Sequence, residues 1–328
     1  MFPAQALASE LKDAGHEVMM VTDERGASLV ADDIDVKHVP STAFFGRSVG
    51  DKFRSVKAFF KGKRECMKLI EEHKPNAVVG AGGYASYPVI RAAKQRKVPI
   101  FLLEQNSVPG RVTRLSAGAA REIYLGIPTV KGVTLKGKAV LTGNVLRKSV
   151  ILKPGKEGKR ILVLGGSGGA KKLNYLGYEL AGNHPREKFT ILTGKRDYAE
   201  LKAKPVLRNL DLIEFTTHPE ELYAKTRVAI SRAGAITLSE LLVNGIPSIL
   251  VPFPFAIDDH QRYNALWAHE EGAALMVEEK ELERVKPLLN ELIKDRNQRQ
   301  KMSENARKLV SADAARVIRE RIEKCLAA

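Results

Sequence analysis

Residues 231–264 read SRAGAITLSELLVNGIPSILVPFPFAIDDHQRYN, and this stretch decides the fold of the chain. The pattern predicts a glycine turn at 231–234 that enters a helix, then a buried strand over 248–251 and a polar loop. Backbone N–H groups at a helix start are unpaired and lie at the positive end of the helix dipole, so this turn suits a phosphate. Polar side chains past a strand's carboxyl end lie where open α/β sheets bind ligands. Taken alone, the stretch also fits an ordinary strand–turn–helix with a solvated loop.

A second glycine-rich turn, GGSGG at residues 165–169, follows an apolar run and precedes a helical pattern. Glycines permit positive φ angles and a close backbone approach, and Ser167 adds a hydroxyl donor, so this turn suits a diphosphate. A lone glycine loop is a weak signal, but two in one half of the chain strengthen it. Neither is a P-loop, because the Gly-Lys-Ser/Thr sequence is absent, and no G-x-G-x-x-G with a partnering acid indicates NAD.

Short β-branched runs alternate with amphipathic helical patterns, which predicts an α/β fold with parallel sheets built from βαβ units. We therefore expect two doubly wound, Rossmann-like domains that face each other across a cleft. The expected strands cover residues 18–21, 77–79, 100–103, 122–125, 161–164, 189–192, 211–215, 228–230 and 248–251.

The lysine- and glycine-rich segment 152–159 predicts a linker between the two domains. The expected domains are residues 1–150 and 151–304, and a long charged helix over 303–326 ends the chain, with residues 305–328 packing back on the first domain. The first domain opens with a helix at 4–14, so it lacks the first strand that is usually central in a doubly wound sheet. Uncovered sheet edges of this kind predict aggregation.

The composition describes a globular chain of 328 residues with a strong basic excess, a net charge of +16. No apolar run approaches the ~20 residues of a membrane-spanning helix, and the N-terminal residues do not read as a signal peptide. Two cysteines exclude a disulfide framework and fit a reducing cytoplasm. The charge calls for an anionic partner, either a membrane surface or a phosphorylated substrate. Nucleic acid is not expected, because no recognisable nucleic-acid motif is present.

Part of the charge is concentrated in residues 43–68, where eight Lys/Arg face two acids and five phenylalanines are interleaved. A helix from about residue 51 would place Phe53, Val56, Phe60, Met67 and Ile70 along one face, which is most simply a core face with solvated lysines. The alternative is a membrane-surface element, an apolar wedge with a basic collar. Its candidate residues are Phe44, Phe45, Phe59, Lys61, Lys63 and Arg64.

Motifs in the first half also follow expected strands. Glu104 and Asn106 lie at a strand's carboxyl end in LEQNSVPG, and Glu104 is a candidate general base or, equally, a loop-organising carboxylate. Arg147, after a Thr-Gly-Asn turn, offers a cation to a phosphate. The seven histidines show no metal-ligand spacing, so no metal is expected.

Together the motifs resemble the MurG family of peptidoglycan N-acetylglucosaminyltransferases, two-domain glycosyltransferases of the GT-B type. The resemblance covers essentially the whole chain and rests on FPAQALASEL, GAGGYASYP, LEQNSVPG, LTGNVLR, GGSGGAKKLN, SRAGAITLSELLVNGIP and VPFPFAIDDHQRYNA. It implies transfer of GlcNAc from UDP-GlcNAc to the muramyl 4-hydroxyl of undecaprenyl-linked lipid I, with inversion, giving lipid II. It also implies an acceptor and membrane-side first domain, a donor-binding second domain, and a peripheral enzyme on the cytoplasmic face of the bacterial inner membrane. Neither a metal nor another cofactor is implied.

The resemblance also implies roles for individual residues. Glu240 takes the ribose of UDP, Ser167 and Arg147 take the phosphate side, and Thr216 and Ile236 border the uracil. Gln261, with Asn264 nearby, reads the sugar. The acceptor side is lined by Asn106, Gly83 and Tyr84.

The chain departs from the family at its start, because the N-terminal strand and the glycine-rich loop that ends in histidine do not precede Phe2. That loop would cradle the lipid diphosphate and supply a general-base candidate. Either the true start lies upstream, which we favour, or the chain is a degenerate paralogue. The alternatives in function are a GT-B enzyme with another acceptor, a non-catalytic nucleotide-sugar binder, and a basic nucleic-acid binder.

Overall fold

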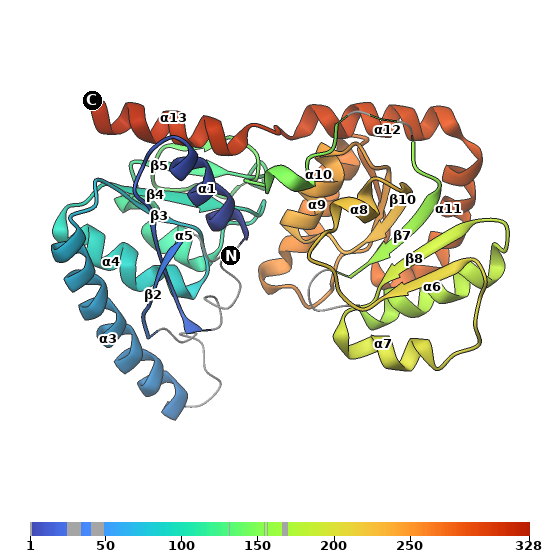
Figure 1. The fold of residues 1–328 in the computed structure, drawn as a ribbon, viewed down its shortest axis with the longest axis horizontal. Helices are drawn as coiled ribbons and strands as arrows, with labels where there is room; N and C mark the ends of the chain where they lie inside the picture. The colour runs from blue at the N-terminus through green and yellow to red at the C-terminus, as the bar shows by residue number, and fades with distance from the viewer. Residues whose placement is uncertain are drawn as a thin grey trace. The chain divides into compact units, whose positions relative to one another are not determined.

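The computed structural model describes residues 2–24, 34–40, 49–130, 132–153, 155, 157–165 and 170–328, with the side chains of 49–55 and 57 left out. These residues form two compact units (Figure 1). Unit 1 comprises Met1–Arg147 with Asp313–Ala328, and unit 2 comprises Lys148–Ala312. Phe44, Phe45 and Ser167 lie outside the described residues, so the roles predicted for them are not addressed by the structure.

Unit 2 is built on a six-stranded parallel sheet in the order β12-β11-β10-β7-β8-β9. The first strand, β7, lies centrally, with β8 on one side and β10 on the other, as a doubly wound sheet requires. The strands are β7 (Arg160–Leu164), β8 (Lys188–Leu192), β9 (Leu210–Ile213), β10 (Thr226–Ser231), β11 (Ser248–Leu250) and β12 (Ala274–Met276). The helices are α6 (Lys171–Asn183), α7 (Lys195–Lys202), α8 (Glu220–Tyr223), α9 (Ala235–Val243), α10 (His260–Glu270), α11 (Val285–Lys294) and α12 (Arg296–Leu309).

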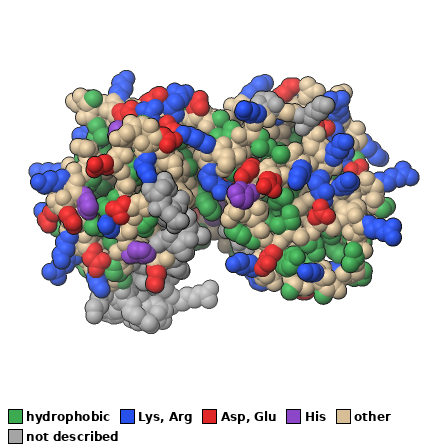
Figure 2. Space-filling view, viewed as in Figure 1, with side chains coloured by type: hydrophobic (Ala, Val, Ile, Leu, Met, Phe, Trp, Pro, Cys, Tyr) green, Lys and Arg blue, Asp and Glu red, His purple; other side chains and the backbone are tan. Residues whose placement is uncertain are grey.

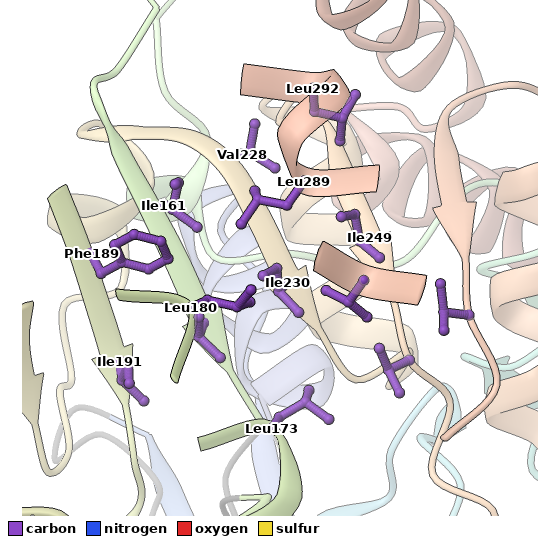
Figure 3. Packing of buried hydrophobic residues seen from close by; sticks show 14 of the residues in the cluster. Ile161, Leu173, Leu180, Phe189, Ile191, Val228, Ile230, Ile249, Leu289 and Leu292 are labelled. Atoms are coloured by element: carbon purple, nitrogen blue, oxygen red, sulfur yellow. The ribbon is translucent and has the colours of Figure 1, made fainter. Parts of the chain in front are cut away.

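Apolar side chains that alternate along the strands of unit 2 pack on both faces of its sheet. In β7, Ile161 and Val163 pack on one side, together with residues of α6 and α11, as Figure 3 shows for Ile161 and its neighbours. Leu162 and Leu164 pack on the other side with Tyr223 and residues of α9. Successive strand side chains point to opposite faces, so apolar residues at every position indicate a sheet covered on both sides.

Unit 1 holds two separate parallel sheets, one with the order β1-β2 and one with the order β3-β4-β5-β6. The strands are β1 (Met19–Thr22), β2 (Asp35–His38), β3 (Val78–Gly80), β4 (Ile100–Glu104), β5 (Glu122–Leu125) and β6 (Ala139–Leu141). The helices are α1 (Phe2–Asp13), α3 (Val49–His73), α4 (Tyr87–Arg96), α5 (Arg111–Ser116) and α13 (Ala314–Ala327). In the described part of the chain, β1 pairs only with β2 and β3 only with β4. Among the described residues of unit 1, no strand therefore holds the bridging position that β7 holds in unit 2, as predicted.

The chain terminus differs from the prediction of one long helix over 303–326. Two helices are present, α12 in unit 2 and α13 in unit 1, where α13 lies beside α1 (Figure 1). The break occurs because Val310 adopts extended backbone angles and buries its side chain. Asp313, a residue type favoured at helix starts, then opens α13 and pairs with Arg316.

The segment 152–159, expected to link the domains, is instead bonded to unit 2. The amide of Leu152 donates to Asn244 at 2.8 Å, and Glu157 pairs with Arg299 at 2.6 Å. The division between the units falls at Arg147 and Lys148. Composition alone was misleading here, since exposed lysines and glycines also suit a surface segment that is held by a few polar contacts.

Candidate active site

The two glycine motifs of unit 2 follow neighbouring strands at the point where the strand order reverses. The first motif lies in the chain between β7 and α6, and the turn 231–234 leaves β10 and leads into α9. From β7 the chain proceeds outward through β8 and β9, whereas β10, β11 and β12 extend the sheet on the other side. The carboxyl ends of the strands at such a switch point form the ligand crevice of open α/β sheets. The turn–helix arrangement predicted for 231–234 is confirmed. For the first motif, the flanking strand and helix are present as predicted, and residues 166–169 lie outside the described residues.

The turn before α9 is shaped to present backbone amides. Gly234 is the N-cap with extended angles (φ −64°, ψ 135°), and no side chain caps the helix start. From α10, the fully buried amide of Asn264 donates to the Ala233 carbonyl at 3.1 Å and supports the turn from below. The contact of Asn264 with a sugar stays a prediction, since in this structure the side chain has a supporting role. A helix start of this kind attracts an anion.

Glu240 lies on α9 and is 9% exposed. Its Oε2 accepts a hydrogen bond of 2.7 Å from the hydroxyl of Tyr223, which ends α8 and is itself buried. The carboxylate is thus held in a fixed direction on the helix that follows the turn. This placement suits the diol-binding role that the family resemblance implies for Glu240.

The loop that follows β11 is strained at two adjacent aspartates. Asp258 and Asp259 have φ angles of 52° and 54°, in the left-handed region that non-glycine residues rarely adopt. Strain of this kind clusters at functional sites. Gln261, just inside α10, accepts a hydrogen bond of 3.0 Å from the Phe253 amide through its Oε1 and so braces the loop. Phe255, which lies in the same loop between Phe253 and Gln261, is 81% exposed.

The two residues expected beside the uracil lie on different parts of the edge. Thr216 follows β9, and its hydroxyl accepts from the His218 amide at 3.0 Å. Ile236 lies half-buried in the first turn of α9, after β10. Two strands separate β9 from β10 in the sheet, about 14 Å at the usual strand spacing. Of the predicted donor-site residues, Ile236, Glu240, Gln261 and Asn264 are gathered around β10 and β11, and Thr216 lies apart.

In unit 1, Glu104 ends β4 and is buried, with 3% exposure. Its carboxylate accepts from the Gly110 amide at 2.9 Å, the Thr113 hydroxyl at 2.6 Å and the Asn106 amide at 3.1 Å. This is the geometry of a loop-organising carboxylate, the alternative stated for it above. Its role as general base stays a prediction.

The loops after β3 and β4 and the Thr-Gly-Asn turn after β6 are tied together. The Gln105 side chain donates to the Ala81 carbonyl at 3.3 Å, and the Asn144 amide donates to the Gln105 carbonyl at 3.1 Å. Gly126 is required beside Asn144, because a Cβ there would lie 2.0 Å from the Asn144 Oδ1. The predicted acceptor-side residues Asn106, Gly83 and Tyr84 belong to these loops.

Two of those predicted residues have defined settings. Gly83 has a positive φ of 69°, and Tyr84 donates from its hydroxyl to Asp23 at 3.3 Å, which links the loop after β3 to the end of β1. Arg147 closes unit 1, with its guanidinium carbon 5.1 Å from the centre of the Phe2 ring.

The prediction of which face of α3 is buried is partly wrong. Ile70 is buried and Met67 half-buried as predicted, but Val56 and Phe60 are 41% and 62% exposed. The buried stripe instead contains Gly62, Cys66 and Ile70, and half-buried Phe59 stacks on the Tyr87 ring at 5.3 Å. The side chain of Phe53 lies outside the described residues. The close approach of the chain at Gly62 sets this rotation, because a Cβ there would lie 2.3 Å from the Pro40 carbonyl oxygen. Phe60, and not Phe59, is therefore the exposed aromatic residue beside Lys61, Lys63 and Arg64.

Comparison with known families decides the class of the protein. Residues 1–125 match the glycosyltransferase family 28 N-terminal domain, and residues 160–322 match the glycosyltransferase family 28 C-terminal domain. The chain belongs to glycosyltransferase family 28. The family match covers both units and both glycine turns, so the protein is a glycosyltransferase of two α/β domains.

Relatives in family 28 carry a specific activity in their names. A protein of Geotalea uraniireducens is 32% identical, with 97% of this chain and 93% of the relative covered. One of Geotalea daltonii is 30% identical, with 97% and 92% covered. Both are named UDP-N-acetylglucosamine--N-acetylmuramyl-(pentapeptide) pyrophosphoryl-undecaprenol N-acetylglucosamine transferase. The crystal structure of MurG from Acinetobacter baumannii shares the fold, with a TM-score of 0.79 at 24% identity over 98% of this chain and 95% of that one.

Sequence reasoning missed three residues that shape the site of this family 28 enzyme. Arg232 stands in the quoted turn but received no role, although a buried arginine needs a partner and its place beside the turn could have prompted the question. Tyr223 and Glu279 carried no signal, since a tyrosine and a glutamate in charged segments resemble surface residues. No group of three or more His, Cys, Asp and Glu residues able to hold a metal is present in the described ranges.

Proposed function

We propose that this chain transfers GlcNAc from UDP-GlcNAc to the muramyl 4-hydroxyl of undecaprenyl-linked lipid I and so forms lipid II in peptidoglycan synthesis. The observation that carries the proposal is the glycine turn 231–234 at the switch point between β7 and β10, with Glu240 held by Tyr223 on the helix that follows this turn. The names of the family 28 relatives, which match nearly the whole chain, supply the substrates.

On this proposal the donor is bound from its nucleotide end. The amides at the start of α9 receive the diphosphate, and the Glu240 carboxylate accepts hydrogen bonds from the ribose diol. Gln261 and the loop it braces take the GlcNAc moiety. The diphosphate is the anchor, because a dianionic group gains most from the helix dipole.

Transfer is an in-line displacement. The acceptor hydroxyl attacks the anomeric carbon of GlcNAc. The bond between that carbon and the diphosphate oxygen breaks, and the configuration at the carbon inverts. The negative charge that develops on the leaving UDP is stabilised by the start of α9. The family resemblance implies a further contribution from the Arg147 cation. Glu104 orders the acceptor-side loop that contains Asn106. The hydroxyl proton passes to a general base, the role for which Glu104 is the candidate in this chain.

The lipid acceptor requires access to a membrane surface, and we infer that the exposed side of α3 provides it at the cytoplasmic leaflet. Val56, Phe60 and Arg64 lie at i, i+4 and i+8 on one helix face, with Lys61 beside them. An apolar wedge flanked by cations binds an anionic interface without spanning it. In the described residues, no helix is long and apolar enough to cross a bilayer.

Calorimetric titration of the chain with UDP-GlcNAc and UDP-GalNAc tests the donor site. Selective binding of UDP-GlcNAc that is lost in Glu240→Ala, and kept in a Glu221→Ala control on the exposed side of α8, is the expected result. Incubation with a lipid I analogue then tests transfer. Absence of UDP-GlcNAc binding by the folded protein contradicts the proposal.

A second candidate function, nucleotide-sugar binding without transfer, is favoured by one observation: among the described residues of unit 1, β1 pairs only with β2 and β3 only with β4. The same experiment separates the two. UDP-GlcNAc binding without formation of a lipid II analogue supports the binder, and turnover excludes it.

A further inference from the structure

At the carboxyl edge of the unit 2 sheet lies a cluster of one carboxylate and two cations. Glu279, at the start of the segment Glu279–Arg284 that follows β12, and Arg232, directly after β10, each have only 7% of their side chain exposed and form an ion pair. Lys172, in the first turn of α6, contacts the other Glu279 oxygen at 2.7 Å. Glu279 thus joins elements that follow β7, β10 and β12, although none of the donor-binding roles inferred above involves it.

Arg232 carries this connection into the loop after β11. Its Nη1 donates to the carbonyls of Val251 at 3.2 Å and Pro252 at 3.0 Å, and its guanidinium carbon lies 5.4 Å from the centre of the Phe253 ring. The Phe253 amide in turn donates to Gln261. A continuous chain of contacts therefore leads from Glu279 through Arg232 and the start of the loop to the residue expected to read the sugar.

The direction of Arg232 depends on its counter-ion. A buried guanidinium without a partner is strongly unfavourable, so loss of the carboxylate drives the side chain toward water and removes the donor from the Val251 and Pro252 carbonyls. Burial of Glu279 opposes its ionisation, but hydrogen bonds from Lys172 and Arg232 prevail and hold the pKa of this carboxyl below its usual value. The group is a carboxylate throughout the physiological pH range.

We propose that Glu279 is a positioning residue for the donor sugar: it orients Arg232, which fixes the loop 252–261 against the glycine turn. The contact with Lys172 joins the same carboxylate to the helix that follows the first glycine turn. This inference rests on the proposed function for the identity of the sugar. The effect of Glu279 on the loop 252–261 does not depend on which sugar is bound. Since the fixed loop lies on the sugar side and Glu240 on the nucleotide side, Glu279 affects UDP-GlcNAc more than UDP.

Glu279→Gln tests the proposal, with Glu281→Gln as the matched control, because Glu281 is in the same segment and its ion pair within the described residues is the local one with Arg284. Calorimetry is expected to show about a tenfold rise in the Kd for UDP-GlcNAc, the usual effect of losing a charged hydrogen bond, and less than about a twofold rise for UDP. Hydrogen exchange in peptides covering 252–261 is expected to accelerate in Glu279→Gln alone. Unchanged exchange in that loop overturns the proposal, as does an equal rise for UDP and UDP-GlcNAc.

A double variant, Glu279→Leu with Arg232→Met, separates positioning from stability. Replacing a buried ion pair by apolar residues of similar volume often preserves stability, whereas the carbonyls of Val251 and Pro252 still lose their donor. Accelerated loop exchange in this folded variant supports the proposal, and wild-type exchange overturns it. If the wild-type protein binds no UDP-GlcNAc, the proposed function fails, and the exchange experiment still decides the role of Glu279.

Discussion

The Arg321 guanidinium in α13 donates to both carboxylate oxygens of Glu122 at the start of β5, each at 2.8 Å. Glu122 is 1% exposed and also contacts Lys138 at 2.6 Å. A bidentate pair with fixed geometry is among the stronger ion pairs in proteins. It attaches the C-terminal helix to the sheet of unit 1, next to the apolar contacts of Ile318 and Ile322.

This pair predicts acid sensitivity in unit 1. Burial raises the pKa of Glu122, but hydrogen bonds from Arg321 and Lys138 prevail and lower it from 4.5 to about 2. Because the folded pKa is lowered, the stabilisation is complete above pH 4.5 and is lost as the pH falls toward 2. Solvent screening reduces the stabilisation below the roughly 3 kcal/mol that this pKa shift corresponds to, because the Lys138 side chain is 65% exposed.

Urea unfolding of the wild type and Glu122→Gln between pH 2 and 7 measures this term. The difference in unfolding free energy is expected to shrink as the pH falls through the window from 4.5 to about 2. Glu320→Gln, which removes an exposed charge from the same helix, is expected to change stability by less than about 0.5 kcal/mol. A pH-independent difference for Glu122→Gln would show that the carboxylate does not contribute through its ionisation.

The hydrogen bond from Tyr223 to Glu240 predicts a separable contribution to nucleotide binding. Tyr223→Phe removes the donor that directs the carboxylate, so the Kd for UDP is expected to rise by about tenfold. Tyr178→Phe is the control, because it loses a hydroxyl bond of the same 2.7 Å length to the Pro205 carbonyl on the outer surface. Tighter UDP binding by Tyr223→Phe would instead mean that the tyrosine competes with the ribose.

Much of the fold was predictable because buried parallel strands have a strong local signature. The strands β7, β10 and β11 contain the apolar runs ILVL, VAI and IL, and a glycine motif or a proline follows each strand. Three strands were missed, β2, β6 and β12. Each has three or four residues, and DVKH and AVL carry partly exposed side chains at the edge of a sheet, which gives no clear period.

The site was predictable where backbone shape defines it and less so where side chains meet across the fold. The local sequence around Gly234 is enough to predict the turn there. The partners of Glu240 and Arg232 come from segments 17 and 47 positions away, and no local pattern reports such pairings. The rotation of α3 was misjudged for a related reason, since it is set by a close contact between Gly62 and Pro40. Lysines and phenylalanines at mixed spacing fit two helix faces equally well.

Transfer is expected to proceed without a divalent metal, because the proposal assigns stabilisation of the leaving diphosphate to a helix N-terminus. The family resemblance implies that the Arg147 cation adds to it. The rate with a lipid I analogue is expected to be equal in EDTA and in Mg²⁺. Arg147→Ala is expected to lower kcat by about a hundredfold, the usual effect of removing one donor to a developing negative charge. Lys148→Ala, the exposed neighbour, serves as control. Loss of the rate in EDTA would assign the charge stabilisation to a metal.

Exposed Phe60 on α3 predicts a measurable share of membrane affinity. Phe60→Ser removes apolar surface that inserts into the interface, and the partition coefficient onto vesicles with phosphatidylglycerol is expected to fall by about tenfold. Leu115→Ser is the matched control, since Leu115 is similarly exposed, 67% against 62%, on the separate helix α5. Binding that remains should weaken with salt, because the cations next to Phe60 act through screened charge. An equal fall in the partition coefficient for both variants would show that α3 is not a specific docking surface. Phe59→Ser is not used as a test of docking, because Phe59 stacks on Tyr87 and its loss would lower the stability of the fold.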